Sequence, residues 1–249
     1  MGRFWWKSAA LSDIGRVRGD NEDSVFSSDE AGVFVVADGM GGHAAGEVAS
    51  AIASTMIGAR LCAECDCVGL EEARELFKNA FADAGREIAE QASQNLSQIG
   101  MGTTATVLLL RTDGHYLVGH IGDSRAYMLR NDQLAQITRD HSWVQEQVDR
   151  GMLTPQQARN HPQSNIITRA LGTEPDPSPD LFGGHILSGD RFLLASDGLT
   201  DMLSEDRIAA VLSTEADPAG AAARLVKEAN LAGGLDNITA LIAVVEEVA

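Results

Sequence analysis

Short apolar runs and longer amphipathic stretches follow one another along the chain, and each kind predicts a different element. The run from Gly32 to Asp38 (GVFVVAD) is rich in β-branched and aromatic residues, which is typical of a buried strand. In the middle of the chain, turn pairs such as Asp113-Gly114 and Asn131-Asp132 separate closely spaced runs, which predicts an antiparallel meander. The predicted strands span residues 32–38, 103–111, 115–121, 124–130, 133–138, 185–188, 191–195 and 237–245.

Apolar residues at three- and four-residue steps predict the helices. Between Leu70 and Ile88, Ala and Phe residues recur at this spacing while Glu and Arg fill the other face. The predicted helices span 47–63, 70–98, 206–212 and 219–232, with a further region at 140–160 that is broken near Gly151, and the Pro-containing stretch 172–180 is predicted to be a loop. Because strands and helices come in runs, the pattern favours an α+β fold with antiparallel sheets.

Composition is consistent with one globular domain over residues 1–249. Hydrophobic residues make up 44% of the chain, which is enough for a sizeable core. Its 19 Lys and Arg against 36 Asp and Glu give a net charge of −17. Such a polyanion does not hold nucleic acid or an anionic membrane by general electrostatics, so we expect neither as a partner. Bound metal ions can still reverse the sign of a local site.

The N-terminus and the cysteines favour a cytoplasmic protein. The opening residues MGRFWWK lack the long apolar region of a signal peptide, and the longest apolar run, Ile238 to Val245, is too short to span a membrane. The aromatic residues Phe4 to Trp6 are interpreted as a hydrophobic cover on the fold, with a partner-binding patch as the alternative. The three cysteines, Cys62, Cys65 and Cys67, are clustered and odd in number, so they imply no disulfide framework. We interpret them as reduced thiols. A zinc site is the alternative, but no fourth ligand is evident nearby.

Four aspartates lie where predicted strands begin or end. Asp38 and Asp197 follow apolar strands, Asp123 follows another, and Asp236 precedes the last strand. Each could simply belong to a turn, because Asp-Gly is a common turn pair. Together they favour a site for hard divalent cations such as Mg²⁺ or Mn²⁺, which prefer carboxylate oxygens.

A polar stretch near the N-terminus adds a cation to these acids. Arg18 precedes the acidic residues Asp20, Glu22 and Asp23. The stretch is interpreted either as a solvated loop or as part of a phosphate site, since a guanidinium binds phosphate through two parallel hydrogen bonds.

Eight short motifs in order give the chain a family resemblance. From about Ala10 to Val245 it resembles the compact bacterial form of the metal-dependent PPM phosphatases, also called the protein phosphatase 2C family. The resemblance implies a β-sandwich of two antiparallel sheets flanked on each side by helices (α-β-β-α). It also implies that residues 139–172 form a flap near the site, with a plain pair of packed surface helices as the alternative. The motifs are SDIGRVRGDNED, VVADGMGGHAAGE, MGTTATVLL, GHIGDSRAY, ITRDHSWV, NIITRALG, LLASDGLTD and GGLDNITALI.

The same resemblance implies an activity and a set of site residues. It implies that a hydroxide bridging two Mn²⁺ or Mg²⁺ ions attacks phosphoserine or phosphothreonine in phosphorylated proteins directly, with a third ion nearby, and that the enzyme opposes a Ser/Thr kinase. By motif, Asp38 would bridge the metals, the Gly39 carbonyl would ligate the second ion, Asp197 and Asp236 would hold the first, Asp123 with Asp197 would hold the third, Arg18 would bind phosphate, and Glu22 and Asp23 would support the metals through water.

Two questions stay open at this point. One question is the source of the proton for the leaving group. Many eukaryotic relatives have a histidine directly after the Asp-Gly pair, but this chain has Met40 there. The proton donor is therefore either His43 or water on the third ion. A regulatory pseudophosphatase and a phosphatase for small phosphoesters are the alternative functions. The presence of Arg18 and of all four strand-end aspartates favours an active protein phosphatase.

Overall fold

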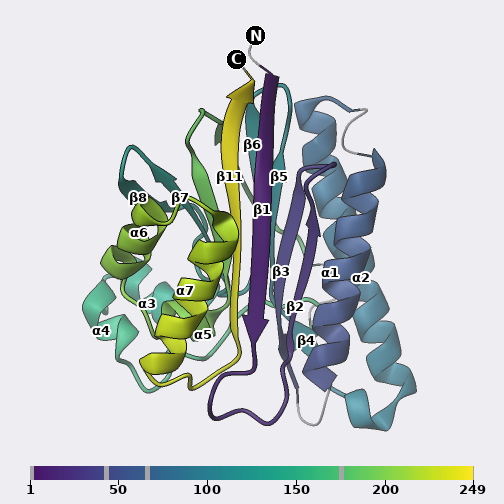
Figure 1. Cartoon of the computed structure of the whole chain (residues 1–249). Coiled ribbons are helices and arrows are strands. Elements are labelled where there is room, and N and C mark those ends of the chain that lie inside the picture. The colour runs from purple at the N-terminus through teal and green to yellow at the C-terminus, as the bar shows by residue number, and fades with distance from the viewer. Residues whose placement is uncertain (1–2, 42–44, 65–67, 174–176, 249) are drawn as a thin grey trace.

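The computed structural model describes residues 3–41, 45–64, 68–173 and 177–248, and its strands form two antiparallel sheets packed face to face (Figure 1). One sheet has the order β1-β11-β10-β7-β8, with β1 (Arg3–Asp13), β11 (Ile238–Val248), β10 (Arg191–Ala195), β7 (Arg125–Arg130) and β8 (Gln133–Gln136). The other has the order β2-β3-β5-β6-β9, with β2 (Asp23–Ser28), β3 (Val33–Met40), β5 (Ala105–Leu110), β6 (His115–Ile121) and β9 (Asp180–His185), and β4 (Gly102–Thr103) pairs with β3.

Helices cover the outer face of each sheet. Helices α1 (Ala45–Glu64) and α2 (Leu70–Gln94) lie on the sheet that contains β3, and α6 (Glu205–Thr214) and α7 (Pro218–Leu231) lie on the other (Figure 1). The short helix α5 (Asp197–Thr200) follows β10, and α3 (Trp143–Asp149) and α4 (Pro155–Arg159) lie within residues 139–172. The predicted α-β-β-α sandwich and its α+β class are therefore confirmed.

The core has three apolar layers because the central strands are buried on both faces. On β3, Phe34 points between the sheets while Val35 points toward α1 and α2, and both are fully buried. This arrangement explains why the strand is apolar at every position from Val33 to Ala37 instead of alternating. Ile208 and Leu225 complete the third layer, under α6 and α7.

The main corrections to the predicted elements concern two strands that precede Gly32. Strands β1 and β2 were not predicted, because the stretch before Gly32 was interpreted as a hydrophobic cover followed by a polar loop. In fact β1 pairs with β11 along its whole length, from Arg3 opposite Val248 to Asp13 opposite Ile238. Its partner lies more than 200 residues away in the sequence, so no local pattern specifies the pairing.

Three other predictions of elements were wrong. The strand expected at 185–188 is β9, which ends at His185 and begins inside the stretch predicted as a loop. Gly183 and Gly184 conceal it, since glycine is rare in strands; a Cβ on Gly184 would lie 2.9 Å from the Tyr116 ring. Helix α2 ends at Gln94 and gives way to a 3₁₀ turn (η2, Leu96–Gln98), and the short helix α5 was not predicted.

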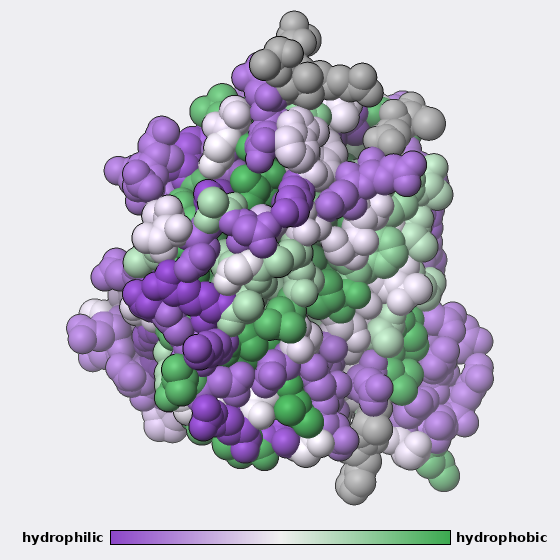
Figure 2. Space-filling view, in the orientation of Figure 1, coloured by the Kyte–Doolittle hydropathy of each residue, from purple (hydrophilic) through white to green (hydrophobic). Residues whose placement is uncertain are grey.

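The surface is polar at the periphery and more apolar in the centre. In Figure 2, apolar residues come to the surface mainly along the middle of the view, where β1 and β11 lie, and hydrophilic residues cover most of the rest. Within the described ranges, no helix has the length and apolar character needed to span a bilayer. Cys62, on α1, is partly buried and packs against the core, and Cys65 and Cys67 lie outside the described residues.

The neighbouring residues Trp5 and Trp6 provide a test of the inter-sheet core. Trp6 is 8% exposed, packs between the sheets and donates a hydrogen bond from Nε1 to the Asp29 carbonyl at 2.7 Å, whereas Trp5 is 44% exposed. We predict that Trp6→Ala lowers the free energy of unfolding by about 3–5 kcal/mol, because it leaves a cavity and an unpaired carbonyl. Trp5→Ala is the matched control and should cost well under half as much in urea unfolding. Equal losses would contradict the assigned packing.

Candidate metal centre

The strand-end aspartates lie at one end of the sandwich, opposite the two termini (Figure 1). Asp38 lies on β3 of one sheet, opposite Asp23 in the register with β2. In the other sheet β10 runs into Asp197, and Asp236 lies just before β11. Because β10 and β11 are antiparallel, with Ala195 opposite Ala240, the end of one and the start of the other meet at the same edge.

Two threonines hold the backbone of Asp38. Its N–H donates to Thr104 Oγ1 at 2.9 Å, and its carbonyl accepts from Thr103 Oγ1 and from the Thr104 N–H, both at 2.9 Å. Thr104 Oγ1 also lies 2.7 Å from Ser124 Oγ, next to Asp123. Asp38 and Asp123 are therefore linked through their neighbours. These threonines belong to the MGTTATVLL motif, whose role in the site was not predicted.

Gly39 allows the backbone at the end of β3 to approach α1 closely. A Cβ at this position would lie 2.1 Å from the Gly46 carbonyl oxygen, which is a steric clash. The Gly39 N–H donates to the Glu22 carbonyl at 3.1 Å, so the loop that carries Glu22 is fixed against the same strand end.

Asp23 is a buried carboxylate that joins the two sheets. Its Oδ2 accepts hydrogen bonds from Ser196 Oγ at 2.8 Å and Thr239 Oγ1 at 2.6 Å, and both donors belong to the opposite sheet's strand ends. Its Oδ1 is buried without a hydrogen-bond partner. Burial raises the pKa of Asp23 from 3.8 to about 6, although the two hydroxyls oppose this shift.

Asn237 fixes the loops around Asp236. Its side-chain oxygen accepts from the Glu22 N–H at 2.8 Å, and its nitrogen donates to the carbonyls of Ile14 at 3.0 Å and Asp20 at 2.9 Å. Sequence reasoning named Asp236 but missed Asn237, Ser196 and Thr239. For Ser196 and Asn237, a position directly beside a predicted site aspartate was the signal available, whereas Thr239 lies three residues after Asp236.

Burial and mutual repulsion raise the pKa values of the clustered acids. Burial, followed by the charges of Asp201 and Asp236, raises the pKa of Asp197 from 3.8 to about 7. The pKa of Asp38 rises well above its usual value, first because of burial and then because of the neighbouring carboxylates. The pKa of Asp123 rises for the same reasons, with Asp197 as the strongest neighbour. Burial also raises the pKa of Glu22.

Arg18 is ion-paired with one of these acids. Its Nη2 lies 2.5 Å from Asp236 Oδ2, while Asp236 Oδ1 accepts the Asn237 N–H at 2.8 Å. Both side chains are partly exposed at the rim of the site. In this arrangement the guanidinium lies against Asp236, which the family resemblance assigns to a metal.

The donor set fits hard divalent cations. Unpartnered, buried carboxylate oxygens on Asp23 and Asp123 and the raised pKa values indicate that positive charge is missing from the cluster. Across the described ranges, no three Asp, Glu, His or Cys side chains are already arranged as a closed ligand set.

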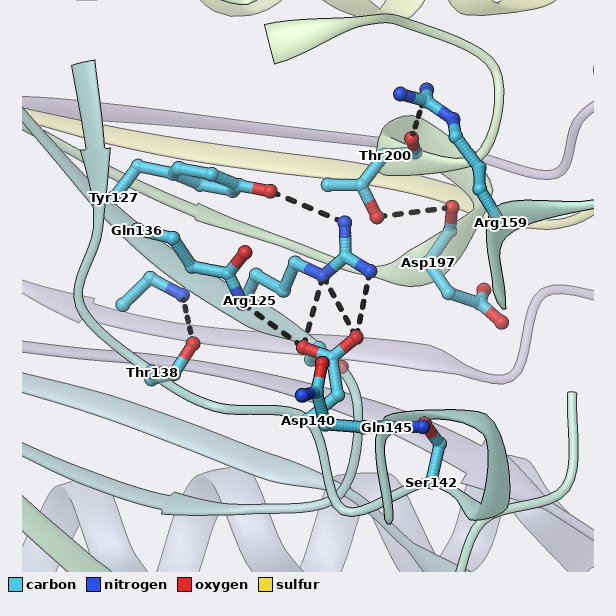
Figure 3. Close-up of polar contacts among 12 residues, drawn as sticks. Arg125, Tyr127, Gln136, Thr138, Asp140, Ser142, Gln145, Arg159, Asp197 and Thr200 are labelled. Carbon is cyan, nitrogen blue, oxygen red and sulfur yellow. Dashed lines mark hydrogen bonds and ion pairs between the residues drawn. The ribbon is translucent and has the colours of Figure 1, made fainter. Parts of the chain in front are cut away.

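A cavity of about 430 Å³ opens beside Asp123 and Asp197 and extends beneath α3 and α4. Figure 3 shows Arg125 at its wall, bonded to Asp140 at 2.6–3.0 Å, with the Asp197 carboxylate directed away from this pair. Arg159 of α4 donates to the carbonyls of Thr200 at 3.2 Å and Leu203 at 2.9 Å, which fastens α4 over α5. Residues 139–172 thus form one side of a hollow next to the acids.

Comparison with known proteins assigns the family. Residues 15–232 match the family described as protein phosphatase 2C. The chain belongs to the protein phosphatase 2C family. It is 43% identical over 243 residues to the protein phosphatase PhpP of Streptococcus pneumoniae, covering 95% of this chain and 97% of that protein. It is 44% identical over 236 residues to the serine/threonine protein phosphatase PstP of Mycobacterium tuberculosis, covering 94% of this chain and 44% of PstP.

Solved structures of this family share the fold. A crystal structure of the Mycobacterium tuberculosis phosphatase PstP has a TM-score of 0.90 at 40% identity, covering 97% of this chain and 99% of that one. A PstP catalytic domain in complex with two manganese ions has a TM-score of 0.86 at 39% identity, covering 98% and 99%. The protein phosphatase 2C member described here is a serine/threonine protein phosphatase, and the resemblance found in its motifs is confirmed. Its family is metal-dependent.

The raised pKa values predict how the metal-free phosphatase responds to pH. A carboxyl whose pKa is higher in the folded state destabilises the fold once it ionises, so stability should fall as pH rises from about 4 through about 7. We expect a melting temperature several degrees lower at pH 8 than at pH 5 in EDTA, and saturating Mn²⁺ should remove most of this loss.

Two variants check the origin of that loss. Asp23→Asn keeps an oxygen for Ser196 and Thr239 and should flatten the pH dependence in EDTA. Asp206→Asn, which removes an exposed acid on α6, should leave the dependence unchanged. Thermal melts that are flat with pH in EDTA, or equally steep in Asp23→Asn, would count against the explanation.

Proposed function

We propose that this phosphatase hydrolyses phosphoserine and phosphothreonine in proteins by direct attack of water-derived hydroxide on phosphorus, at a site that holds Mn²⁺ or Mg²⁺. The observation that carries the proposal is the convergence of Asp38, Asp197 and Asp236 from the ends of both sheets, within a cluster whose carboxylates outnumber the guanidinium of Arg18. Asp38 and the Gly39 carbonyl, with Asp197 and Asp236, would hold two ions, and Asp123 with Asp197 would hold a third. When bound, such cations lower the pKa of water and neutralise phosphate charge.

The remaining residues act on orientation and charge. Arg18 would leave Asp236 and bind the phosphate, because a dianion offers two oxygens to its guanidinium where Asp236 offers one. Its position at the rim, half exposed, leaves it room for that movement. Asp23 and Glu22 would accept hydrogen bonds from water at the centre, which suits the position of the buried Asp23 opposite Asp38 and of the half-buried Glu22 beside Gly39.

The proton for the leaving group has no assigned donor among the described residues. His43 lies outside them. His43 therefore stays a candidate by its motif position, and water near Asp123 is the other candidate. A phosphoenzyme is not required, because the proposed attack of hydroxide on phosphorus is direct. None of the three cysteines lies in a sequence pattern that would cradle a phosphate.

The physiological partners follow from the activity. Phosphorylated proteins are its substrates as a serine/threonine protein phosphatase. A cognate Ser/Thr kinase is proposed as the enzyme it opposes. The presence of Arg18 and of the four strand-end aspartates supports an active enzyme over a pseudophosphatase.

A direct assay tests the proposal. We predict Mn²⁺-dependent release of phosphate from a phosphothreonine peptide by the wild-type protein. Asp38→Ala and Asp236→Ala should each lower kcat more than about a thousandfold, because several kcal/mol of transition-state stabilisation are lost. Asp206→Asn, which removes an exposed acid on α6, is the control. Near-normal kcat in either alanine variant at saturating Mn²⁺ would overturn the metal assignment, and turnover restricted to p-nitrophenyl phosphate would favour small phosphoesters.

Arg18 gives a separate prediction. Arg18→Ala should raise KM for the phosphopeptide roughly tenfold or more, since it removes a charge-assisted contact to phosphate. It should not weaken Mn²⁺ binding measured by calorimetry, because it frees Asp236 Oδ2 from the ion pair. Arg16→Ala removes a cation from the same loop and is the matched control. A loss of Mn²⁺ binding with unchanged KM would instead make Arg18 a support of the metal site.

A further inference from the structure

Gly122 forms the turn that places Asp123 at the site. It follows the last residue of β6 and has a positive φ of 106°. A Cβ here would lie 2.5 Å from the Thr104 side chain, so the position requires glycine. Without a side chain to pack, Gly122 is held in place by backbone hydrogen bonds.

His141 is the partner of both backbone groups of Gly122, its N–H and its carbonyl. The Gly122 N–H donates to His141 Nδ1 at 3.0 Å, and the His141 N–H donates to the Gly122 carbonyl at 2.7 Å. The second bond holds the peptide group that joins Gly122 to Asp123. On the other side, the Ser124 carbonyl accepts from Thr106 Oγ1 at 2.9 Å. Asp123 is thus fixed between two anchored peptide groups, with its Oδ1 buried and unpartnered.

The hydrogen bonds define the tautomer of His141. Since Nδ1 accepts the Gly122 N–H, a neutral ring carries its proton on Nε2, which lies 3.2 Å from Asp180 Oδ2. Arg169 Nη1 lies 2.8 Å from the same nitrogen but has its own acceptor, Asp180 Oδ1, at 2.8 Å. The opposite tautomer would leave the buried Gly122 N–H facing another donor.

His141 also lies where both ends of the 139–172 segment join the sandwich. Its carbonyl accepts the Thr168 N–H at 2.8 Å, and Ser142 and Ile167 form an adjacent bridge. Its ring stacks on His120, with centroids 4.9 Å apart. The side chain is therefore packed on all sides and joins this segment to the end of β6.

We propose that His141 is a positioning residue that holds Asp123 in its place at the metal centre through the paired hydrogen bonds to Gly122. The effect of His141 on turnover rests on the proposed function. Its structural part stands alone. Histidine suits the role because one ring nitrogen accepts from Gly122 while the other donates to Asp180.

The first test uses the metal-free wild-type protein. Nitrogen NMR of the imidazole should show an unprotonated Nδ1 and a protonated Nε2 at His141. Hydrogen exchange should show a protected Gly122 amide. A protonated Nδ1 at neutral pH, or a Gly122 amide that exchanges as fast as one in an exposed loop, would overturn the proposal without any variant.

The second test compares His141→Asn, His141→Gln and His141→Ala. Asparagine can place its amide oxygen near the position of Nδ1, whereas glutamine reaches the position of Nε2. We expect Gly122 protection and kcat/KM for a phosphothreonine peptide to stay within about threefold in His141→Asn. Both should fall on the order of tenfold or more in the other two variants, the range typical for outer-shell partners.

Control measurements separate the possible failures. His115→Ala removes an imidazole at the far end of β6 and should change neither quantity. Equal kcat/KM in folded His141→Ala and wild type would overturn the positioning role. If the wild type turns over no phosphopeptide, the proposed function fails, while the Gly122 exchange and the His141 tautomer still decide the structural assignment.

Discussion

Repulsion among buried carboxylates is the constraint on which the rest of the site depends. Asp23, Asp38, Asp123 and Asp197 all have raised pKa values because they are buried close to one another. A fold that gathers such groups must hold them rigidly, since each would gain solvation by moving outward. The sandwich does this by placing them on the ends of strands whose other residues are fixed in the core.

The rigidity comes from small polar groups more than from ion pairs. Thr103 and Thr104 hold the backbone of Asp38, and Ser196 and Thr239 hold the carboxylate of Asp23 across the gap between the sheets. Each of these hydroxyls is fully buried. Neutral hydroxyls donate hydrogen bonds without adding a formal charge. They therefore orient the acids and leave the negative charge of the carboxylates for a cation to neutralise. Arg18, the guanidinium paired with Asp236, lies at the rim, where it can exchange partners.

The sequence predicted the strands that end at the clustered aspartates better than it predicted the edge strands β1 and β9. Asp38 and Asp197 could be found because each follows an apolar run, and a strand end is a local signal. β1 could not be found, because its partner β11 lies at the other end of the chain, and β9 was concealed by its two glycines. Asn237 was overlooked for a related reason, since its three hydrogen bonds go to backbone groups in loops that only the tertiary fold brings together. His43 lies outside the described residues, so its role as proton donor stays a prediction from its motif.

The long pairing of β1 with β11 has a consequence for how the enzyme can be tethered. Both termini emerge side by side at one end of these strands, and the acids lie at the other. Eleven paired residues at about 3.3 Å each separate the two ends by roughly 35 Å. A fluorescent protein or a surface linker joined to either terminus would therefore leave the catalytic end facing outward, open to a bulky phosphorylated protein.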